Sequence, residues 1–205
     1  MVSEIRIYAE GGRDQRSGKA AVQEGFGKFL SPLKEMARER HIRWYVVACG
    51  SRQSAFDAFQ IALKQHRDAF NVLLVDGEGP VTRSPWEHLQ NRDHWPIQGI
   101  PDDHCHLMVQ VMEAWIVADL EILERFYGQG FNANPIPARG DVELIVKADL
   151  EHALIQATRN TQKGEYHKIR HGPKILALVE VSKIRNRARH CDRMFTTLSN
   201  KIGEP

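Results

Sequence analysis

One buried strand constrains the fold of this chain more than any other stretch of its sequence. Residues 72–75 are Val-Leu-Leu-Val, an unbroken apolar run typical of a strand that is covered on both faces of a parallel sheet. The run stops at Asp76-Gly77-Glu78-Gly79-Pro80. In open α/β sheets, ligands bind just beyond the carboxyl ends of the strands. Two acids at such an end indicate a cation site, although a surface loop with two solvated acids would have the same sequence.

The segments before this strand alternate between strands and helices. Residues 4–10 and 43–49 have the patterns of strands. Residues 20–40 and 52–70 carry apolar side chains at helical spacing, and Ser31-Pro32 is expected to divide the first of these helices in two. This order predicts an α/β fold with a mostly parallel sheet flanked by helices.

The middle of the chain is less regular. Residues 80–101 contain four prolines, one glycine and two tryptophans, and we expect a long loop there. Trp86 and Trp95 either cover a site or, as we favour, anchor this loop to the core. Residues 106–112 then predict a fourth strand, which runs directly into a helix that begins at Glu113.

The C-terminal part of the chain differs in composition from the rest. A helix is expected from Asp141 to residue 158, and residues 159–189 are strongly basic, although the net charge of the whole chain is only +2. We therefore divide the chain into an α/β core, residues 1–130, and a basic helical extension, residues 131–205, that packs on the same domain. The basic side chains either cover solvated helix faces or contact the phosphates of a nucleic acid. The candidates for phosphate contact are Lys163, Arg170, Lys174, Arg185 and Arg187.

Four acids follow predicted strands and are candidates for metal ligands, namely Glu10, Asp76, Glu78 and Glu113. If these strands are neighbours, the carboxylates converge on one pocket. Oxygen ligands suit Mg²⁺ or Mn²⁺, and such a cation stabilises the attacking and leaving oxygens in phosphoryl displacement. Lys168 is a candidate for holding the phosphate. Glu113 has a second interpretation, because an acid in the first turn of a helix also complements the helix dipole.

The acidic motifs resemble those of the Toprim fold, in which a Glu follows the first strand and a pair of acids follows the third. Here they are Tyr8-Ala9-Glu10-Gly11-Gly12 and Leu74-Val75-Asp76-Gly77-Glu78. The second Asp of the common pair is Glu78 in this chain, which lengthens one ligand arm. Over about residues 4–200, the chain resembles the bacterial domain of unknown function 4276, a Toprim-like family. Further stretches that carry this resemblance include Pro85-Trp86-Glu87-His88-Leu89, Met112-Glu113-Ala114-Trp115 and Tyr166-His167-Lys168.

The resemblance implies a Toprim-like, Rossmann-like fold and a metal-dependent nuclease. It also implies a phage-defence or mobile-element context and an ATPase partner of the ATP-binding-cassette type. The positions that match the family are Glu10, Asp76, Glu78 and Glu113 as metal or catalytic residues, and Lys168 as a catalytic residue. The alternative is a non-catalytic binding or sensor subunit of an ATPase-containing complex. Phosphatase action on a small phosphate ester is a third interpretation, which the spread of the basic segment disfavours.

Other kinds of site find little support in the sequence. His104-Cys105-His106 resembles half of a zinc site, but no second Cys/His pair lies at zinc-like spacing. Cys49 and Cys105 lie in or beside apolar strands, where buried thiols are usually inert. No signal peptide is recognisable, and no apolar run approaches the ~20 residues of a membrane helix. We therefore expect a cytoplasmic protein without a membrane segment.

Overall fold

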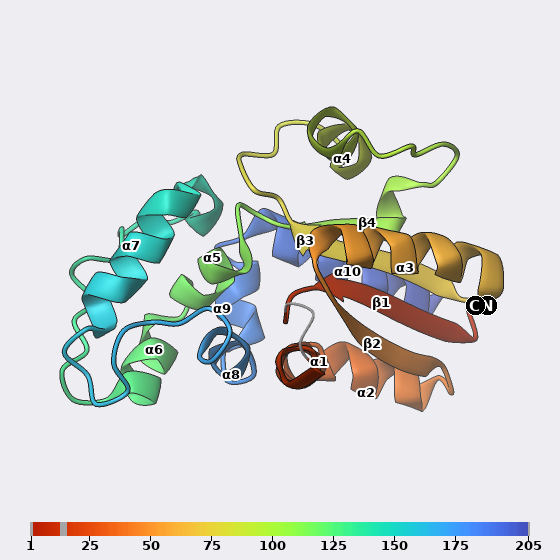
Figure 1. The fold of residues 1–205 in the computed structure, drawn as a ribbon. Coiled ribbons are helices and arrows are strands. Elements are labelled where there is room, and N and C mark those ends of the chain that lie inside the picture. Colours follow the sequence, from red (N-terminus) through yellow and green to blue (C-terminus); the bar gives the residue numbers. More distant parts are fainter. Residues whose placement is uncertain (1, 13–15, 205) are drawn as a thin grey trace.

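A computed structural model of the chain describes residues 2–12 and 16–204. Its centre is a sheet of four strands, β1 (Glu4–Glu10), β2 (Arg43–Gly50), β3 (Phe70–Asp76) and β4 (Cys105–Met108). The strands are all parallel and lie in the order β2-β1-β3-β4. Helices cover both faces of this sheet (Figure 1). The predicted α/β fold with a parallel sheet is therefore confirmed.

The strand β3 is buried along its whole length. It pairs with β1 on one side and with β4 on the other. Successive side chains of a strand point to opposite faces of the sheet, and here Val72 and Leu74 join one apolar cluster while Leu73 and Val75 join the other. This burial on both faces explains why the apolar run in the sequence is unbroken.

One face of the sheet is covered by α3 (Arg52–Gln65) and by α4 (Pro85–Asp93). The helix α4 lies in the segment that we expected to be a loop, so that prediction was wrong. Its start has a capping box, in which the side chain of Ser84 and the backbone N–H of Glu87 are paired, and Pro85 occupies the first turn. Both features are local signals for the start of a helix, and they explain why α4 forms although its sequence has no clear helical spacing of apolar residues.

The two tryptophans of this segment anchor it to the core, as the sequence favoured. Trp95 stacks on Phe56 of α3, with 4.1 Å between the ring centroids. The indole nitrogen of Trp86 donates a hydrogen bond to the carbonyl oxygen of Pro101 at 2.9 Å. Both side chains are buried, so α4 is held firmly against the sheet.

The other face is covered by α1 (Arg16–Phe29), α2 (Ser31–Glu39) and α10 (Arg189–Gly203). The break between α1 and α2 lies at Ser31-Pro32, as predicted. The helix α1 also approaches α8 (Gly172–Leu176) closely, because Gly25 has no side chain. A Cβ atom at that position would lie 2.6 Å from the carbonyl oxygen of Pro173.

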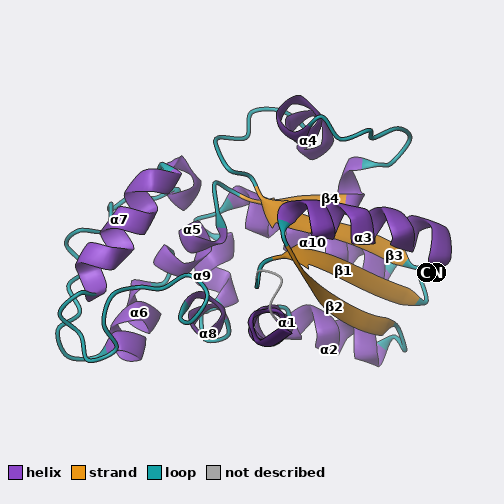
Figure 2. Ribbon diagram, in the orientation of Figure 1, coloured by secondary structure: helices purple, strands orange, loops and turns teal. Residues whose placement is uncertain are grey.

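The remaining helices lie beside the carboxyl ends of the strands (Figure 2). Apolar residues of these helices, such as Trp115 and Leu154, belong to the same buried cluster as Ile5 and Phe195. The core is therefore continuous between the sheet and the C-terminal helices. Besides α8, this helical layer contains α5 (Met112–Val117), α6 (Leu120–Tyr127), α7 (Lys147–Thr158) and α9 (Val181–Arg185).

Several boundaries differ from the predicted ones. The strand β4 ends at Met108 and not at Met112, because its partner β3 ends at Asp76, which pairs with Met108. The helix predicted to begin at Glu113 is divided in two at Asp119, whose side chain caps α6. The helix predicted from Asp141 begins only at α7, after a 3-10 turn (Val142–Leu144). In the described part of the chain, no helix combines the length and the apolar composition needed to cross a membrane.

Candidate metal centre

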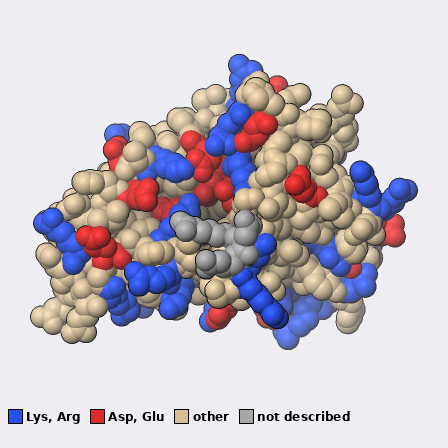
Figure 3. All heavy atoms as spheres, in the orientation of Figure 1, with Lys and Arg blue, Asp and Glu red and all other residues tan. Residues whose placement is uncertain are grey.

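Three of the candidate acids meet at the carboxyl edge of the sheet. Glu10 ends β1 and Asp76 ends β3, and these two strands are neighbours. Glu78 lies in the turn that leaves β3. One carboxylate oxygen from each of the three lies within 4.8 Å of the other two. Figure 3 shows acidic atoms gathered near the middle of this face, with basic atoms close by.

Asp76 is the most enclosed of these acids, with 3% of its surface exposed. Its Oδ1 accepts a hydrogen bond from the backbone N–H of Met112 at 2.8 Å, and its Oδ2 lies 3.2 Å from the Nζ of Lys168. Burial raises the pKa of Asp76 above its ordinary value, the charge of Lys168 opposes this shift, and the charge of Glu113 adds to it. The carboxylate therefore needs a nearby cation to remain ionised.

Glu10 shares this environment. Its Oε2 accepts a hydrogen bond from the backbone N–H of Asp76 at 3.1 Å and lies 3.4 Å from the Nη1 of Arg52. Burial, and after it the charge of Asp76, raises the pKa of Glu10 to about 7. The guanidinium of Arg52 also donates two hydrogen bonds, of 2.9 and 2.8 Å, to the carboxylate of Asp93 at the end of α4. Arg52 thus connects the acid of β1 to the covering helix.

Glu78 is held by the backbone of the turn and by a lysine. Its φ of 62° lies in the left-handed region, which is uncommon for a residue with a side chain. Its backbone N–H donates to the carbonyl oxygen of Gln110 at 2.6 Å, which fixes the turn against the end of β4. Lys147 forms an ion pair with the carboxylate. Burial alone would raise the pKa of Glu78, but the contact with Lys147 outweighs it and lowers that pKa.

Glu113 lies on the other side of Lys168 and is not one of the three converging acids. The chain turns after Met108, so Glu113 lies in the first turn of α5. Its Oε1 accepts a hydrogen bond from the hydroxyl of Tyr166 at 2.9 Å, and its Oε2 lies 3.4 Å from the Nζ of Lys168. Burial would lower the pKa of Lys168, but the charges of Asp76 and Glu113 outweigh it and raise that pKa. Glu113 therefore orients Lys168 toward Asp76.

The donor set fits a hard divalent cation. Five carboxylates at this edge face four cationic side chains, which leaves one negative charge in excess. Burial is the largest cause of the raised pKa values of Glu10 and Asp76, and the charge of a neighbouring carboxylate adds to it. Three oxygen donors close together are what Mg²⁺ and Mn²⁺ take from proteins. The carboxylates are those of Glu10, Asp76, Glu78, Asp93 and Glu113, and the cationic groups are those of Arg52, Arg92, Lys147 and Lys168.

Sequence reasoning missed the residues that hold the acids in place. Arg52, Asp93, Lys147 and Tyr166 contact the centre, although none of them belongs to an acidic motif. Arg52 comes two residues after the end of β2, but we considered only acids at strand ends. Tyr166 lies within a stretch already identified as typical of the family, and its position two residues before Lys168 is the one signal that could have found it. The others are brought in by tertiary contacts over long sequence distances.

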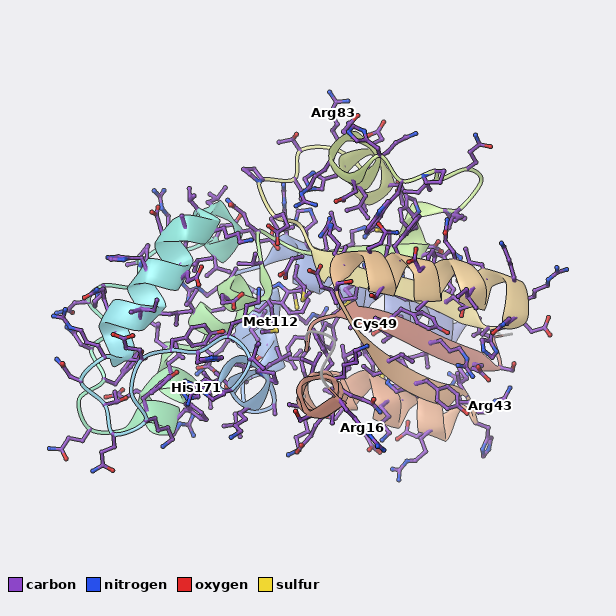
Figure 4. All side chains as sticks on the ribbon, in the orientation of Figure 1. Arg16, Arg43, Cys49, Arg83, Met112 and His171 are labelled. Atoms are coloured by element: carbon purple, nitrogen blue, oxygen red, sulfur yellow. The ribbon has the colours of Figure 1, made fainter. Side chains whose placement is uncertain are left out.

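Two cavities border the carboxylates. The larger of the two has a volume of about 400 Å³ and is lined by Glu10, Asp76 and Lys168 together with apolar side chains. Met112, which lines this cavity, lies where the sheet meets the helical layer (Figure 4). The second is an open groove between the Glu78 turn and α4, and Arg83 and Arg92 border it.

The basic C-terminal residues are divided between exposed and structural positions. Lys163, Arg170 and Lys174 are exposed. Arg185 instead forms an ion pair with Asp192 at 2.7 Å. Arg187 donates hydrogen bonds to backbone carbonyl oxygens, including that of Ala118 at 2.8 Å. Phosphate contact remains a prediction for all five candidates, and the structure leaves the side chains of the first three more accessible.

The other candidate sites do not assemble. Burial raises the pKa of Cys49 to about 11 and that of Cys105 well above its ordinary value, so neither thiol is poised as a nucleophile. Burial lowers the pKa of His106 to about 3, and its ring is held by Asp103 and Arg193. Within residues 2–12 and 16–204, the three acids described above are the one group of three or more side chains placed to share a metal ion.

Comparison with known proteins identifies the family of the chain. No curated protein and no solved structure matches it. The profile of one protein family, described as Domain of unknown function (DUF4276), matches residues 10–199. This match begins at Glu10 and includes every residue of the acidic centre. The chain therefore belongs to the DUF4276 family.

Proposed function

We propose that this protein is a nuclease that hydrolyses phosphodiester bonds in DNA or RNA with the help of Mg²⁺ or Mn²⁺. The observation that carries the proposal is the convergence of Glu10, Asp76 and Glu78 within 4.8 Å, with Lys168 beside them. Carboxylates held together at the carboxyl edge of a parallel sheet lie where ligands bind in such folds. The ammonium group adds the positive charge that a phosphate requires.

Each residue has a distinct task in this proposal. Glu10, Asp76 and Glu78 would hold the cation, which when bound stabilises the charge of the attacking and leaving oxygens. Lys168 binds a non-bridging phosphate oxygen and is kept protonated by Asp76 and Glu113. The Oε2 of Glu10 is held by Asp76 and Arg52. This leaves its other oxygen free to hold the cation or to accept a proton from the attacking water.

A second function is favoured by one specific observation. Each converging acid already has a cationic partner within the chain, since Arg52 contacts Glu10, Lys168 contacts Asp76 and Lys147 contacts Glu78. An acidic centre whose charges are balanced within the chain can serve the stability of the fold without binding a metal ion. The protein would then be a non-catalytic binding or sensor subunit of a complex that contains an ATPase.

We also propose the cytoplasm as its location, since all three cysteines are free.

A cleavage assay distinguishes the two functions. Purified protein is incubated with single- and double-stranded DNA and RNA in Mg²⁺, Mn²⁺ or EDTA, beside Asp76→Asn and the matched control Asp57→Asn, whose carboxylate is exposed on α3. If the protein is a nuclease, the wild type cleaves nucleic acid with Mg²⁺ or Mn²⁺ but not in EDTA. The Asp76→Asn variant then loses this cleavage, and the Asp57→Asn variant keeps it. Nucleic-acid binding without cleavage, equal in all three proteins, would favour the sensor subunit.

A further inference from the structure

The cavity beside the acidic centre is lined by two chemically different sets of side chains. Glu10, Asp76 and Lys168 are the charged ones. The apolar lining consists of Val22 from α1, Met108 and Met112 from the end of β4 and the start of α5, and Ile169 and Pro173 from the segment around α8. Its volume of about 400 Å³ lies at the lower end of the range of ligand sites, about 300–1,000 Å³. One small ring system with an attached polar group fits such a space.

Two glycines that line the cavity have few backbone groups left for hydrogen bonds to a ligand. Gly11 and Gly50 line it, and their backbone groups bond to each other, with N–H to carbonyl distances of 2.9 and 3.0 Å. A Cβ atom at Gly11 would lie 3.3 Å from the methyl groups of Val22. The glycine, whose φ is 133°, therefore leaves the methyl groups of Val22 free to form the cavity wall. A flat apolar ligand meets methyl and thioether groups there and few polar ones.

We propose that this cavity binds one unstacked nucleobase of a single-stranded nucleic acid, whose adjoining phosphate lies at Lys168 and the three acids. This inference rests on the proposed function and specifies its substrate. A base within a duplex is paired and stacked and cannot enter a cavity of this size, whereas the bases of a single strand are free to do so. The bases differ in the hydrogen-bonding groups along their edges, but apolar contacts involve only the flat face of the ring. We therefore expect the cavity to accept all bases.

The charges around the cavity agree with this orientation. Lys168 lines the cavity next to Ile169, its Nζ lies 3.2 Å from the Oδ2 of Asp76, and half of its side chain is exposed. Beyond Glu78, the second groove is bordered by Arg83 and Arg92, which suit the next phosphates of a strand. Figure 4 shows Arg83 projecting from the α4 region. A single strand would thus place its base in the cavity and its backbone across the carboxylates.

Base insertion can be measured without cleavage. A short single strand carrying 2-aminopurine, whose emission rises when the base is unstacked, is titrated with wild-type protein in Ca²⁺ and again in EDTA. Duplex DNA with the same base and free nucleoside monophosphate are run beside it. We expect higher emission with the single strand only, and weaker binding of the duplex and of the mononucleotide. Equal binding of the duplex would overturn the inference, and tight binding of the mononucleotide would assign the cavity to free nucleotides instead.

Two variants from different elements narrow the cavity, Ile169→Trp near α8 and Val22→Phe in α1. Each is expected to weaken single-strand binding about tenfold, the size of effect of one lost base contact. Leu178→Trp adds the same side chain at a position that is 54% exposed and outside the cavity, and it should change nothing. Unchanged affinity in both cavity variants, with melting temperature and Mn²⁺ binding intact, contradicts the inference. Base insertion without any cleavage would instead refute the nuclease function alone.

Discussion

The ammonium nitrogen of Lys168 lies 3.2 Å from the Oδ2 of Asp76, so the chain supplies its own cation to its most buried candidate ligand. Replacing Lys168 by Met removes a charge that competes with a metal ion but also removes the group that binds phosphate. We expect Mn²⁺ to bind at least as tightly as in the wild type, while kcat/KM for cleavage falls about 100-fold or more. Calorimetric titration and a cleavage assay measure the two quantities separately.

The matched control for this variant is Lys34→Met, since Lys34 is an exposed lysine on α2, outside the acidic centre and outside the basic C-terminal segment. Neither quantity should change in it by more than about twofold, because a single exposed charge contributes little. A Lys168→Met protein that loses Mn²⁺ binding and cleavage in parallel would show that the lysine serves the fold of the centre and not its chemistry.

The raised pKa of Glu10 makes the stability of the metal-free protein depend on pH. Burial, together with the charge of Asp76, raises the pKa from 4.5 to about 7, so between these values the folded state binds more protons than the unfolded state. The free energy of unfolding therefore falls as pH rises through this window, by about 3 kcal/mol if Glu10 acts alone. Denaturant unfolding in EDTA, at about pH 5 and about pH 8, measures this change.

Glu10→Gln is the control for the pH dependence, because the amide keeps the shape of the side chain and does not titrate. As the pH rises, its free energy of unfolding should fall much less than that of the wild type. Addition of Mn²⁺ should restore stability to the wild type above pH 7, since a ligand of the folded state stabilises it. Identical pH profiles in the two proteins would show that the pKa of Glu10 is not raised.

Arg52 is expected to be the main structural connection between the acidic centre and α4. Arg52→Met removes the two hydrogen bonds from Arg52 to Asp93, a carboxylate with only 11% of its side chain exposed, and leaves Asp93 paired with Arg92 alone. We expect the free energy of unfolding to fall by about 3 kcal/mol, as for other broken buried ion pairs. Arg67→Met, at an exposed position after α3, should leave it unchanged within about 0.5 kcal/mol. Equal stability of the two variants would remove Arg52 from this role.

Replacing two glycines of α1 by alanine is expected to change the stability of the protein in opposite directions. A Cβ atom at Gly25 would lie 2.6 Å from the carbonyl oxygen of Pro173, whereas one at Gly27 would meet nothing within 4 Å. Gly25→Ala should destabilise the protein by about 1–3 kcal/mol through the forced separation of α1 and α8. Gly27→Ala should stabilise it by about 0.5–1 kcal/mol, since alanine favours helix. Thermal unfolding of both proteins tests the packing, and the same sign of change in both would contradict it.

The order of strands and the positions of Glu10, Asp76 and Glu78 could be predicted from the sequence, because each depends on a local pattern. The unbroken run of β3 shows burial on both faces, and the acids come directly after the strands. The end of β4 could not be predicted in this way. Its apolar run continues past Met108, but pairing stops where β3 ends at Asp76, so the strand is limited by its partner and not by its own residues.

The contacts that complete the acidic centre join residues that are far apart in the sequence, so no local pattern could predict them. Lys147 and Glu78 are 69 positions apart, and Arg52 and Asp93 are 41 positions apart. Glu113 shows the same limit, since its place after a predicted strand suggested a metal ligand. The turn after β4 places it beside Tyr166 and Lys168, outside the group of three converging acids. The residue type was informative for all of these side chains, but their partners required the fold.

The most direct test of the central claim is a titration of the metal-free protein with Mn²⁺, followed by electron paramagnetic resonance. We expect a specific site in the wild type, with affinity reduced about tenfold or more in Glu10→Gln, Asp76→Asn and Glu78→Gln. Affinity should be unchanged in Glu113→Gln, whose carboxylate lies across Lys168, and in the exposed control Asp57→Asn. If Mn²⁺ binds equally well to all of these proteins, the three converging acids are not a metal site.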